Sequence, residues 1–280
     1  MISKSAKIRA SIGLYLVYIL ISLFFLLPFL WLVSLSFKTV PELFQSPPKL
    51  LPNQFNFDNY RYVLWKTDIF GYLKNSLIIV LVTVIGSLIF CLPAAYAFSR
   101  FNFKGKKMTM LAILFFQMIS PLIVVIPLYK YLSRLGMLNN YGSLIFVYIA
   151  VVLPFAVWSI KGYIDTVPKE LDEAAAIDGC NKFQTMCMAV LPLVVPGIVS
   201  VVILVVVKSW AQFIVPFILL NDSALYPISV GLVNLQSTAD SITTHYLAAA
   251  AVIGIFPTLL IFVILQRFIV SAMTAGAVKG

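Results

Sequence analysis

Charged residues are scarce in this sequence, and histidine and cysteine are scarcer still. Asp, Glu, Lys and Arg make up 11% of the 280 residues, whereas apolar residues make up 61%. A soluble domain carries about 25% charged residues, and a water-soluble fold has too little core to bury so much apolar surface. The composition therefore excludes an ordinary soluble domain and indicates a membrane protein.

The few histidines and cysteines exclude several kinds of site. His245 is the one histidine, and a single imidazole without a partner cluster cannot form a metal site, so we interpret it as an ordinary residue at a helix end. Cys91 falls in an apolar run, whereas Cys180 and Cys187 fall in a segment predicted to lie in the reducing cytoplasm. The sequence therefore predicts no disulfide and no metal site.

The sequence also has no phosphate-binding loop and no cluster of catalytic groups. The motif Gly-x-x-x-x-Gly-Lys-Ser/Thr is missing, because the nearest stretch, FKGKKMT at 103–109, lacks its spacing. A membrane-embedded enzyme would need a Ser–His pair, paired carboxylates or a metal motif near a helix end. We therefore expect no catalytic residue and no ATP hydrolysis by this chain alone. Any activity of this chain that requires energy must then draw it from a partner or from an ion gradient.

Long apolar runs are what the sequence does have, and six of them are long enough to cross a bilayer. Each is nearly or wholly free of charge over the roughly 20 residues that a transmembrane helix requires. The first is too long for the core of a signal peptide, and Pro121 and Pro127 interrupt the third. The pattern predicts an all-α polytopic membrane protein. The predicted spans are Ile12–Ser36, Leu73–Phe98, Met108–Leu128, Tyr141–Ile160, Val190–Phe217 and Tyr246–Phe268.

Basic residues in the connections predict the orientation of these helices. They are frequent before the first span, after the second, after the fourth and in the tail, and rare in the other short connections. The long first connection departs from this pattern with five basic residues of its own. Because short cytoplasmic loops carry an excess of Lys and Arg, both termini are predicted to be cytoplasmic. The basic residues on the predicted cytoplasmic side are Lys4, Lys7, Arg9, Arg100, Lys104, Lys106, Lys107, Lys161, Lys169, Lys182, Arg267 and Lys279.

The predicted outer connections contain two further features. Four prolines within Thr39–Tyr72 argue against a long helix there, but NFDNYRYVLW at 56–65 has the pattern of a short interfacial helix. The uncharged stretch Ser223–Ala239 is too short and too interrupted by Pro and Gly for a span, so we expect an outer loop or a re-entrant segment. The predicted organisation is a cytoplasmic N-terminus (1–11), a first transmembrane helix with an outer loop (12–72), a core of five transmembrane helices (73–270) with a cytoplasmic loop at 161–189, and a cytoplasmic tail (271–280).

The connection between the fourth and fifth spans concentrates the acidic residues of the chain. Five of the ten Asp and Glu residues lie between Asp165 and Asp178. Thr166 is a candidate N-cap, acidic residues near a helix start favour its dipole, and the alanines that follow are good helix formers. Gly179 ends the predicted helix in a left-handed turn, and a second helix is expected to begin near Lys182.

A helix that is acidic at its start and smooth along its alanines has two interpretations. Another protein could approach its backbone closely and pair Arg or Lys residues with the carboxylates. Alternatively, the segment is a solvated loop whose alanines only favour helix. Physical chemistry alone leaves both interpretations open.

The spacing of this segment resembles the EAA loop of binding-protein-dependent ABC transporter permeases. In that pattern Glu-Ala-Ala is followed after three residues by Gly and later by Leu-Pro. Here these positions are Glu173–Ala175, Gly179 and Leu191–Pro192, and Cys180 stands where the family usually has Ala. The stretches NSLIIV, AAYAFSRFNFKGKK, PLY, SWAQFIVPF and QRFIVSAMTAGAVKG look like the maltose-type permeases of the carbohydrate-uptake subfamily, with Ala272 where that subfamily usually has Gly.

The resemblance implies the type I fold of ABC importer permeases, with six transmembrane helices in the cytoplasmic membrane. It also implies that the chain translocates a sugar or sugar-like solute. The implied partners are a second homologous permease, a dimer of cytoplasmic ATPase subunits that hold ATP and Mg, and an extracytoplasmic solute-binding protein. No cofactor on this chain and no nucleic-acid partner are implied. By position, the ATPase-docking residues are Glu173, Ala174, Ala175, Asp178 and Gly179, with Glu173 the expected ion-pair partner.

An ion-coupled secondary transporter of a small polar solute is the main alternative. Such transporters usually hold buried acidic or histidine side chains for ion coupling, but the predicted spans contain neither. Lys208 is the clear charge within a span, and we interpret it as extending its long side chain to the interface. Contact with the solute, with a partner permease or with Asp222 would also fit. Physical arguments do not exclude a structural membrane subunit, but the docking loop argues against it.

Side chains suited to a sugar lie within or near the third and fifth spans. Amide and hydroxyl groups can bond to solute hydroxyls, and aromatic faces can stack on a sugar ring. Small and polar residues serve helix–helix packing equally well, and we favour that interpretation of the set. The candidate solute-path residues are Gln117, Ser120, Ser209, Trp210, Gln212 and Phe213.

Overall fold

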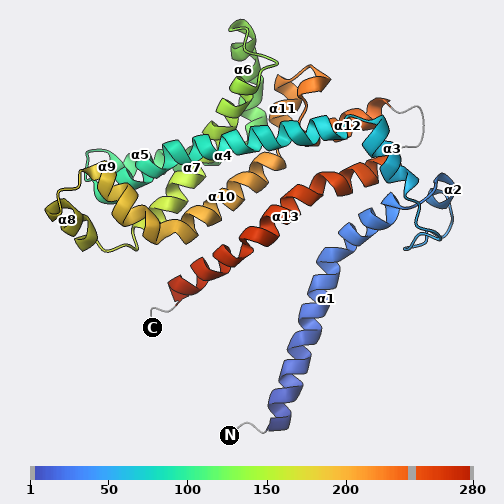
Figure 1. Ribbon diagram of the computed structural model, residues 1–280, viewed down its shortest axis with the longest axis horizontal. Coiled ribbons are helices and arrows are strands. Elements are labelled where there is room, and N and C mark those ends of the chain that lie inside the picture. Colours follow the sequence, from blue (N-terminus) through green and yellow to red (C-terminus); the bar gives the residue numbers. More distant parts are fainter. Residues whose placement is uncertain (1–3, 239–243, 278–280) are drawn as a thin grey trace. The chain divides into compact units, whose positions relative to one another are not determined.

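Every regular element is a helix in the part of the chain that the computed structural model describes, residues 4–238 and 244–277 (Figure 1). The all-α fold class is therefore confirmed. The chain divides into two compact units. The first comprises the chain up to Ile69 together with Leu235–Gly254, and the second comprises Phe70–Asn234 and the chain from Ile255 on.

Five described helical stretches are long and apolar enough to cross a membrane without interruption. They correspond to the first, second, fourth, fifth and sixth predicted spans. In most of them the first or last residue differs from the predicted one by several positions. The stretches are Gly13–Ser36 within α1 (Lys4–Ser36), α4 (Ile69–Arg100), α7 (Tyr141–Ile164), Lys182–Trp210, and Thr244–Gln266 within α13 (Thr244–Ala277).

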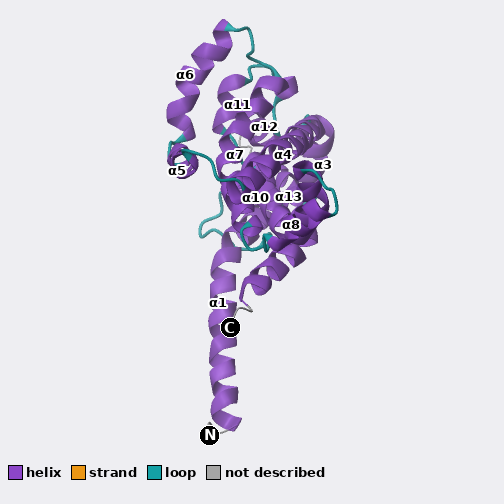
Figure 2. Cartoon of the chain, turned by 90° about the vertical axis from the view of Figure 1, so that its left-hand side faces the viewer, coloured by secondary structure: helices purple, strands orange, loops and turns teal. Residues whose placement is uncertain are grey.

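The third predicted span, Met108–Leu128, is not one straight helix. It is a pair of helices, α5 (Lys106–Gln117) and α6 (Pro121–Arg134), bent by 94° (Figure 2). Proline has no N–H to donate and disfavours helical geometry in the residue before it, and Ser120 accordingly has an extended backbone with ψ 131°. If the bent pair is one broken span, the described residues contain six spans.

The fifth predicted span, Val190–Phe217, is displaced toward the N-terminus. It runs through α9 (Lys182–Gln184), a π-helical turn (Thr185–Val190), a 3₁₀ turn (Leu191–Val194) and α10 (Val195–Trp210). The chain then breaks before α11 (Ile214–Leu219). The break has a local cause, because the ring of Pro216 is incompatible with a helical carbonyl at Gln212, four residues earlier. The Gln212 carbonyl instead accepts a hydrogen bond from Ser229 Oγ at 2.8 Å.

In the first unit, the connection after α1 folds over a short helix. α2 (Val40–Leu43) is only four residues long, as the prolines predict, and the expected helix at 56–65 is present as α3 (Asp58–Lys66). The buried Asn59 side chain donates to the carbonyls of Ser36 and Lys38 at 2.8 and 2.9 Å. His245, near the start of α13, is buried beside the Tyr246 ring.

In the second unit, α4, α7 and α10 share a core of small and β-branched side chains. Glycine allows close approach at two points of this core: Gly86 of α4 faces Ile149, and Gly197 of α10 faces the ring of Tyr163. The core residues from these three helices include Cys91, Ala95, Val152, Ala156, Ile160, Val201 and Val205.

The stretch Ser223–Ala239 is more helical than expected. It forms a 3₁₀ turn (Ser223–Leu225) and α12 (Ile228–Thr238), whereas Ala239 lies outside the described residues. Side chains near the start of α4 form hydrogen bonds to the 3₁₀ turn and to the first residue of α12. Asn75 donates to the Ala224 and Tyr226 carbonyls, and Ser76 Oγ accepts from the Ile228 N–H. Parts of the predicted N-terminus and tail, residues 1–3 and 278–280, also lie outside the described residues.

Candidate functional site

The acidic segment forms the predicted short helix, α8 (Glu170–Ile177). Three carboxylates, those of Glu170, Asp172 and Glu173, lie in its first turn, where they stabilise the positive end of the helix dipole. The helix ends as predicted in a left-handed glycine, Gly179, with φ of 85°. The Cys180 N–H then closes the end by donating to the Ala175 carbonyl at 2.9 Å, as in common glycine C-caps.

Two details of this segment differ from the sequence prediction. The prediction that Thr166 caps α8 is wrong, because Lys169 is the N-cap and the Thr166 hydroxyl donates to the Tyr163 carbonyl at 2.7 Å. Thr166 therefore closes the end of α7. The start of α9 has a capping box that was not predicted, in which Asn181 and Gln184 exchange side-chain to backbone hydrogen bonds. The Asn-x-x-Gln spacing was a usable signal.

A buried ion pair ties α8 to the end of α4. Arg100 Nε lies 2.9 Å from Asp172 Oδ2, with 6% and 12% of the two side chains exposed. The Tyr96 hydroxyl donates to Asp172 Oδ1 at 2.7 Å, and Arg100 Nη2 donates to the Val167 carbonyl at 2.9 Å. Both carboxylate oxygens and two guanidinium nitrogens are thus engaged. The sequence does not reveal this group, because its members are far apart in the chain and the sequence pattern indicates for Arg100 only a position on the cytoplasmic side.

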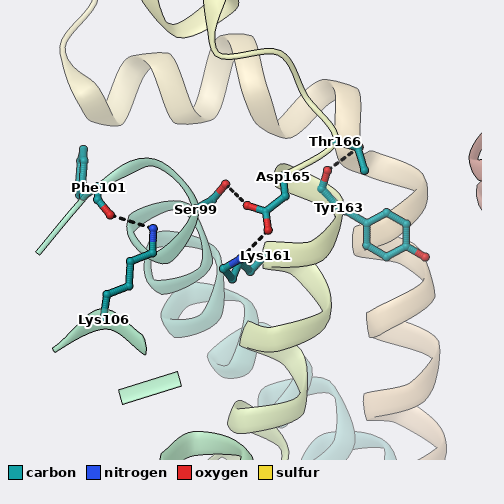
Figure 3. A network of polar contacts seen from close by, with 7 residues as sticks. All are labelled: Ser99, Phe101, Lys106, Lys161, Tyr163, Asp165 and Thr166. Atoms are coloured by element: carbon teal, nitrogen blue, oxygen red, sulfur yellow. Dashed lines mark hydrogen bonds and ion pairs between the residues drawn. The ribbon is translucent and has the colours of Figure 1, made fainter. Parts of the chain in front are cut away.

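A second tie joins the neighbouring residue of α4 to the end of α7 (Figure 3). The Ser99 hydroxyl donates to Asp165 Oδ1 at 2.6 Å, and the Lys161 ammonium pairs with Asp165 Oδ2. Burial alone would raise the pKa of the Asp165 carboxyl. The hydrogen bonds from Lys161 and Ser99, with the positive charges of Lys161 and Lys106, outweigh burial and hold this pKa below its usual value. The carboxylate is therefore charged at neutral pH.

The predicted docking residues lie on an open surface. Glu173, Ala174, Asp178 and Gly179 are exposed, and Ala175 is half-buried. Two large apolar side chains accompany them without cover in this chain, since Ile177 is 87% exposed and Phe183 is 67% exposed. The exposed surface of this segment therefore combines acidic side chains, small alanine side chains and two large apolar side chains.

The structure also contains a cavity of about 630 Å³ among α5, α6, α7 and α10. Three of the candidate solute-path residues line it: Gln117, Ser209 and Gln212. Most of the wall is apolar and includes aromatic rings, and Lys208 contributes a cation. The Ser209 hydroxyl is buried and has no hydrogen-bond partner among the described residues. Binding cavities are typically of this size and have a few polar groups in an apolar wall.

The other three candidate residues have positions elsewhere. Ser120 is the N-cap of α6, Trp210 is buried at the end of α10, and the Phe213 ring stacks on Phe217 at 5.1 Å. None of the three lines the cavity.

The alternative in which Lys208 pairs with Asp222 is not the arrangement in the structure. Asp222 Oδ1 accepts the Ala224 N–H at 2.9 Å and caps the 3₁₀ turn. No ion pair involving Lys208 is present among the described residues.

Comparisons with known proteins identify the family of the chain. Residues 88–275 match the family described as binding-protein-dependent transport system inner membrane component. The chain is 33% identical over 264 residues to the trehalose/maltose transport system permease protein MalG of Thermococcus litoralis, with 94% of each chain covered. It is 32% identical to the inner membrane ABC transporter permease protein YcjP of Escherichia coli, over 99% of this chain and 100% of that protein.

A solved structure shares the fold. A crystal structure of a bacterial ABC transporter involved in the import of the acidic polysaccharide alginate matches with a TM-score of 0.79 and 22% identity, covering 96% of this chain and 99% of that one. The chain belongs to the inner-membrane permease family of binding-protein-dependent ABC transporters. The family resemblance is thereby confirmed, and the ion-coupled alternative is set aside. The protein is a multi-pass protein of the cytoplasmic membrane and the permease rather than the ATPase component of its system.

Proposed function

We propose that this chain is the permease subunit of an ABC importer that carries a sugar or sugar-like solute, driven by ATP hydrolysis on a partner ATPase. Similarity to permeases named for trehalose and maltose transport supports the solute class. The observation that carries the proposal is α8, a short helix at the end of α4 on which the carboxylates of Glu170 and Glu173 and the large apolar side chain of Ile177 are exposed.

In this proposal α8 docks into a cleft of a cytoplasmic ATPase subunit. Glu173 would pair with a basic residue of the ATPase, and the small side chains of Ala174 and Ala175 would let the ATPase approach the helix backbone. Ile177 and Phe183 would fill apolar pockets, which gives a reason for the exposure of Ile177 outside the apolar spans and of Phe183 at the very start of one. Asp178 and Gly179 would shape the turn that follows. ATP and Mg would be bound by the ATPase dimer, not by this chain.

The cavity is the proposed solute path. Gln117, Ser209 and Gln212 would bond to solute hydroxyls, and the aromatic rings of Phe116 and Phe146 would contact a sugar ring. The Ser209 hydroxyl is covered in this chain and has no hydrogen-bond partner among the described residues, so it would have to turn toward the cavity to reach the solute. A second homologous permease would complete the wall, and an extracytoplasmic binding protein would deliver the solute. One relative by fold is an alginate transporter solved in complex with its periplasmic protein.

Reconstitution tests the proposal. The chain is co-expressed with a partner permease, an ATPase and a solute-binding protein from the same organism, and the complex is placed in proteoliposomes. Sugar-loaded binding protein should stimulate ATP hydrolysis and drive sugar uptake, and both should stop when vanadate blocks the ATPase. Uptake that continues with the ATPase blocked and follows an imposed proton or sodium gradient would contradict the proposal.

A further inference from the structure

The link between α4 and α8 is concentrated in one side chain. Asp172 is the one buried residue of α8, whereas the chain connects α8 directly only to α7 and α9. In the described part of the chain, the polar contacts between α4 and α8 all end on the Asp172 carboxylate, which receives Tyr96 from one turn of α4 and Arg100 from the next. α8 is therefore anchored to α4 at its first turn, it packs against the π-helical turn Thr185–Val190 that follows it in the chain, and most of its other side chains are exposed.

The geometry of this anchor is rigid. The planar guanidinium of Arg100 connects two parts of the segment at once, the carboxylate of Asp172 and the carbonyl of Val167. Arginine loses less freedom per bond than lysine in such a fork because its donors are fixed in one plane. The neighbouring residue, Ser99, holds Asp165 on the other side of the same turn. Ser99 and Arg100, which are consecutive residues of α4, thus form hydrogen bonds to two residues of the α7–α8 connection, Asp165 and Val167.

A contribution to folding stability does not by itself explain the buried Arg100–Asp172 ion pair. Removing two charges from water costs several kcal/mol per ion, so buried ion pairs are often no better for stability than apolar residues of the same volume. The contact also departs from good hydrogen-bond geometry, since Arg100 Nε and Asp172 Oδ2 are close but not well aligned. What the pair does provide is a defined position of α8 relative to the end of a membrane-spanning helix.

We propose that Arg100 and Asp172, with Tyr96, are positioning residues that transmit the displacement of α8 to α4 during the transport cycle. This inference rests on the proposed function, in which α8 receives the motion of the ATPase. With the tie intact, α4 moves with α8 as one body. With the tie broken, the ATPase still binds and hydrolyses ATP, but part of its motion is taken up by the α7–α8 turn and does not reach α4.

The test measures solute uptake per ATP hydrolysed in proteoliposomes. Asp172→Asn and Arg100→Gln each remove one charge of the pair. We expect the ATPase subunits to co-purify and stimulated hydrolysis to persist, while uptake per ATP falls about tenfold, within the usual range of coupling between sites. The matched control is Arg61→Gln, which removes the exposed ion pair with Asp58 on α3 and should leave the ratio unchanged.

Two further variants separate positioning from folding. The double variant Arg100→Asp with Asp172→Arg exchanges the two charges and should have a higher uptake per ATP than either single variant. Tyr96→Phe removes only one hydrogen bond and should lower uptake per ATP slightly without loss of membrane insertion. An unchanged ratio in Asp172→Asn or Tyr96→Phe would overturn the inference. Loss of ATPase binding in these variants would also overturn it, because the pair would then belong to the docking surface. A wild-type complex without stimulated hydrolysis or uptake would instead refute the proposed function.

Spin-label distances give an independent readout. Labels at Ala176 of α8 and Ile89 of α4, both solvent- or lipid-exposed in this chain, report whether the two helices move together. One narrow distance should persist through the ATP cycle in wild type, and Asp172→Asn should broaden it. A wild-type distance that changes with nucleotide would contradict the inference.

Discussion

The ammonium group of Lys208 lies 4.6 Å from the centre of the Phe155 ring. This contact joins α10 to α7 at the cavity, where Lys208 supplies a positive charge to a largely apolar wall. Its exposed position means that the contact contributes only about 0.5–1 kcal/mol to stability. The charge also remains accessible to a molecule in the cavity.

The substitution Lys208→Met should therefore affect transport more than folding. Methionine keeps the unbranched stem but removes the charge and the donors. We expect the KM for uptake to rise about tenfold, as for loss of one hydrogen bond from a charged group, while the thermal denaturation midpoint changes little. Transport kinetics and thermal denaturation of the same preparation check both expectations.

A lysine outside the cavity provides the control. Lys130 is exposed on α6 and does not line the cavity, so Lys130→Met should leave the KM unchanged. Equal kinetics for Lys208→Met and wild type would return Lys208 to its first interpretation, a long side chain that extends to the interface.

The proposed docking role predicts a second effect. Glu173→Lys reverses the charge that faces the ATPase, so solute-stimulated ATP hydrolysis should be lost while the chain still inserts into the membrane. Insertion is checked by membrane fractionation, and hydrolysis by phosphate release from the reconstituted complex.

Glu170→Lys makes the same charge reversal in the same turn of α8. Both substitutions lose a favourable interaction with the helix dipole, worth about 0.3–1 kcal/mol, so a difference between them reports docking and not helix stability. We expect Glu170→Lys to keep most of the stimulated hydrolysis. Full uptake by Glu173→Lys would refute the assigned role.

Much of the fold could be predicted because the bilayer imposes simple rules on sequence. A span needs a long uncharged run, and a left-handed turn after a helix needs Gly179 or a similar residue, so both features were found directly. The limits of the spans were less accurate. Pro121 and Pro216 both break helices, but whether a proline bends, ends or merely kinks a helix depends on which neighbours satisfy the freed backbone groups, as Ser229 does for Gln212.

The candidate site also has one part that the sequence predicts and another part that it does not. The helix α8, which we propose docks to the ATPase, is a local sequence pattern, so its position and its end at Gly179 could be predicted. The tie of Arg100 to Asp172 and the cavity depend on the packing of helices that are far apart in the chain. Of the six solute-path candidates, the sequence could not separate those that line the cavity, such as Gln117, from those packed elsewhere, such as Trp210.

Close packing between α7 and α10 predicts a third effect. A Cβ atom added at Gly197 would overlap the Tyr163 ring, so Gly197→Ala should force the helices apart at a cost of about 1–3 kcal/mol. Thermal denaturation in detergent should show a lower midpoint. Gly162→Ala is the control, because a Cβ atom there has no neighbour within 4 Å and alanine favours helix. Similar losses for both variants would contradict the packing argument.

The Asp165 carboxylate predicts a dependence of stability on pH. Its pKa is lower in the folded protein than in the unfolded chain, because the Lys161 and Ser99 hydrogen bonds outweigh burial. A carboxyl group with a lowered folded pKa contributes stability above its unfolded pKa, about 3.9, and this contribution is lost as the pH falls through the folded value. Wild type should therefore be more stable than Asp165→Asn at pH 7, and the difference should shrink below about pH 4.

Thermal denaturation midpoints of wild type, Asp165→Asn and Lys161→Gln between pH 3 and pH 7 measure this effect. Lys161→Gln removes the ion-pair partner but keeps the carboxyl group, so it should lose part of the stability at pH 7 and converge with wild type at low pH. Because 43% of the Asp165 side chain is exposed, solvent screening keeps the effect small, and added salt should reduce it further. A difference between wild type and Asp165→Asn that stays constant down to pH 3 would mean that the side chain stabilises the turn by its shape and not by its charge.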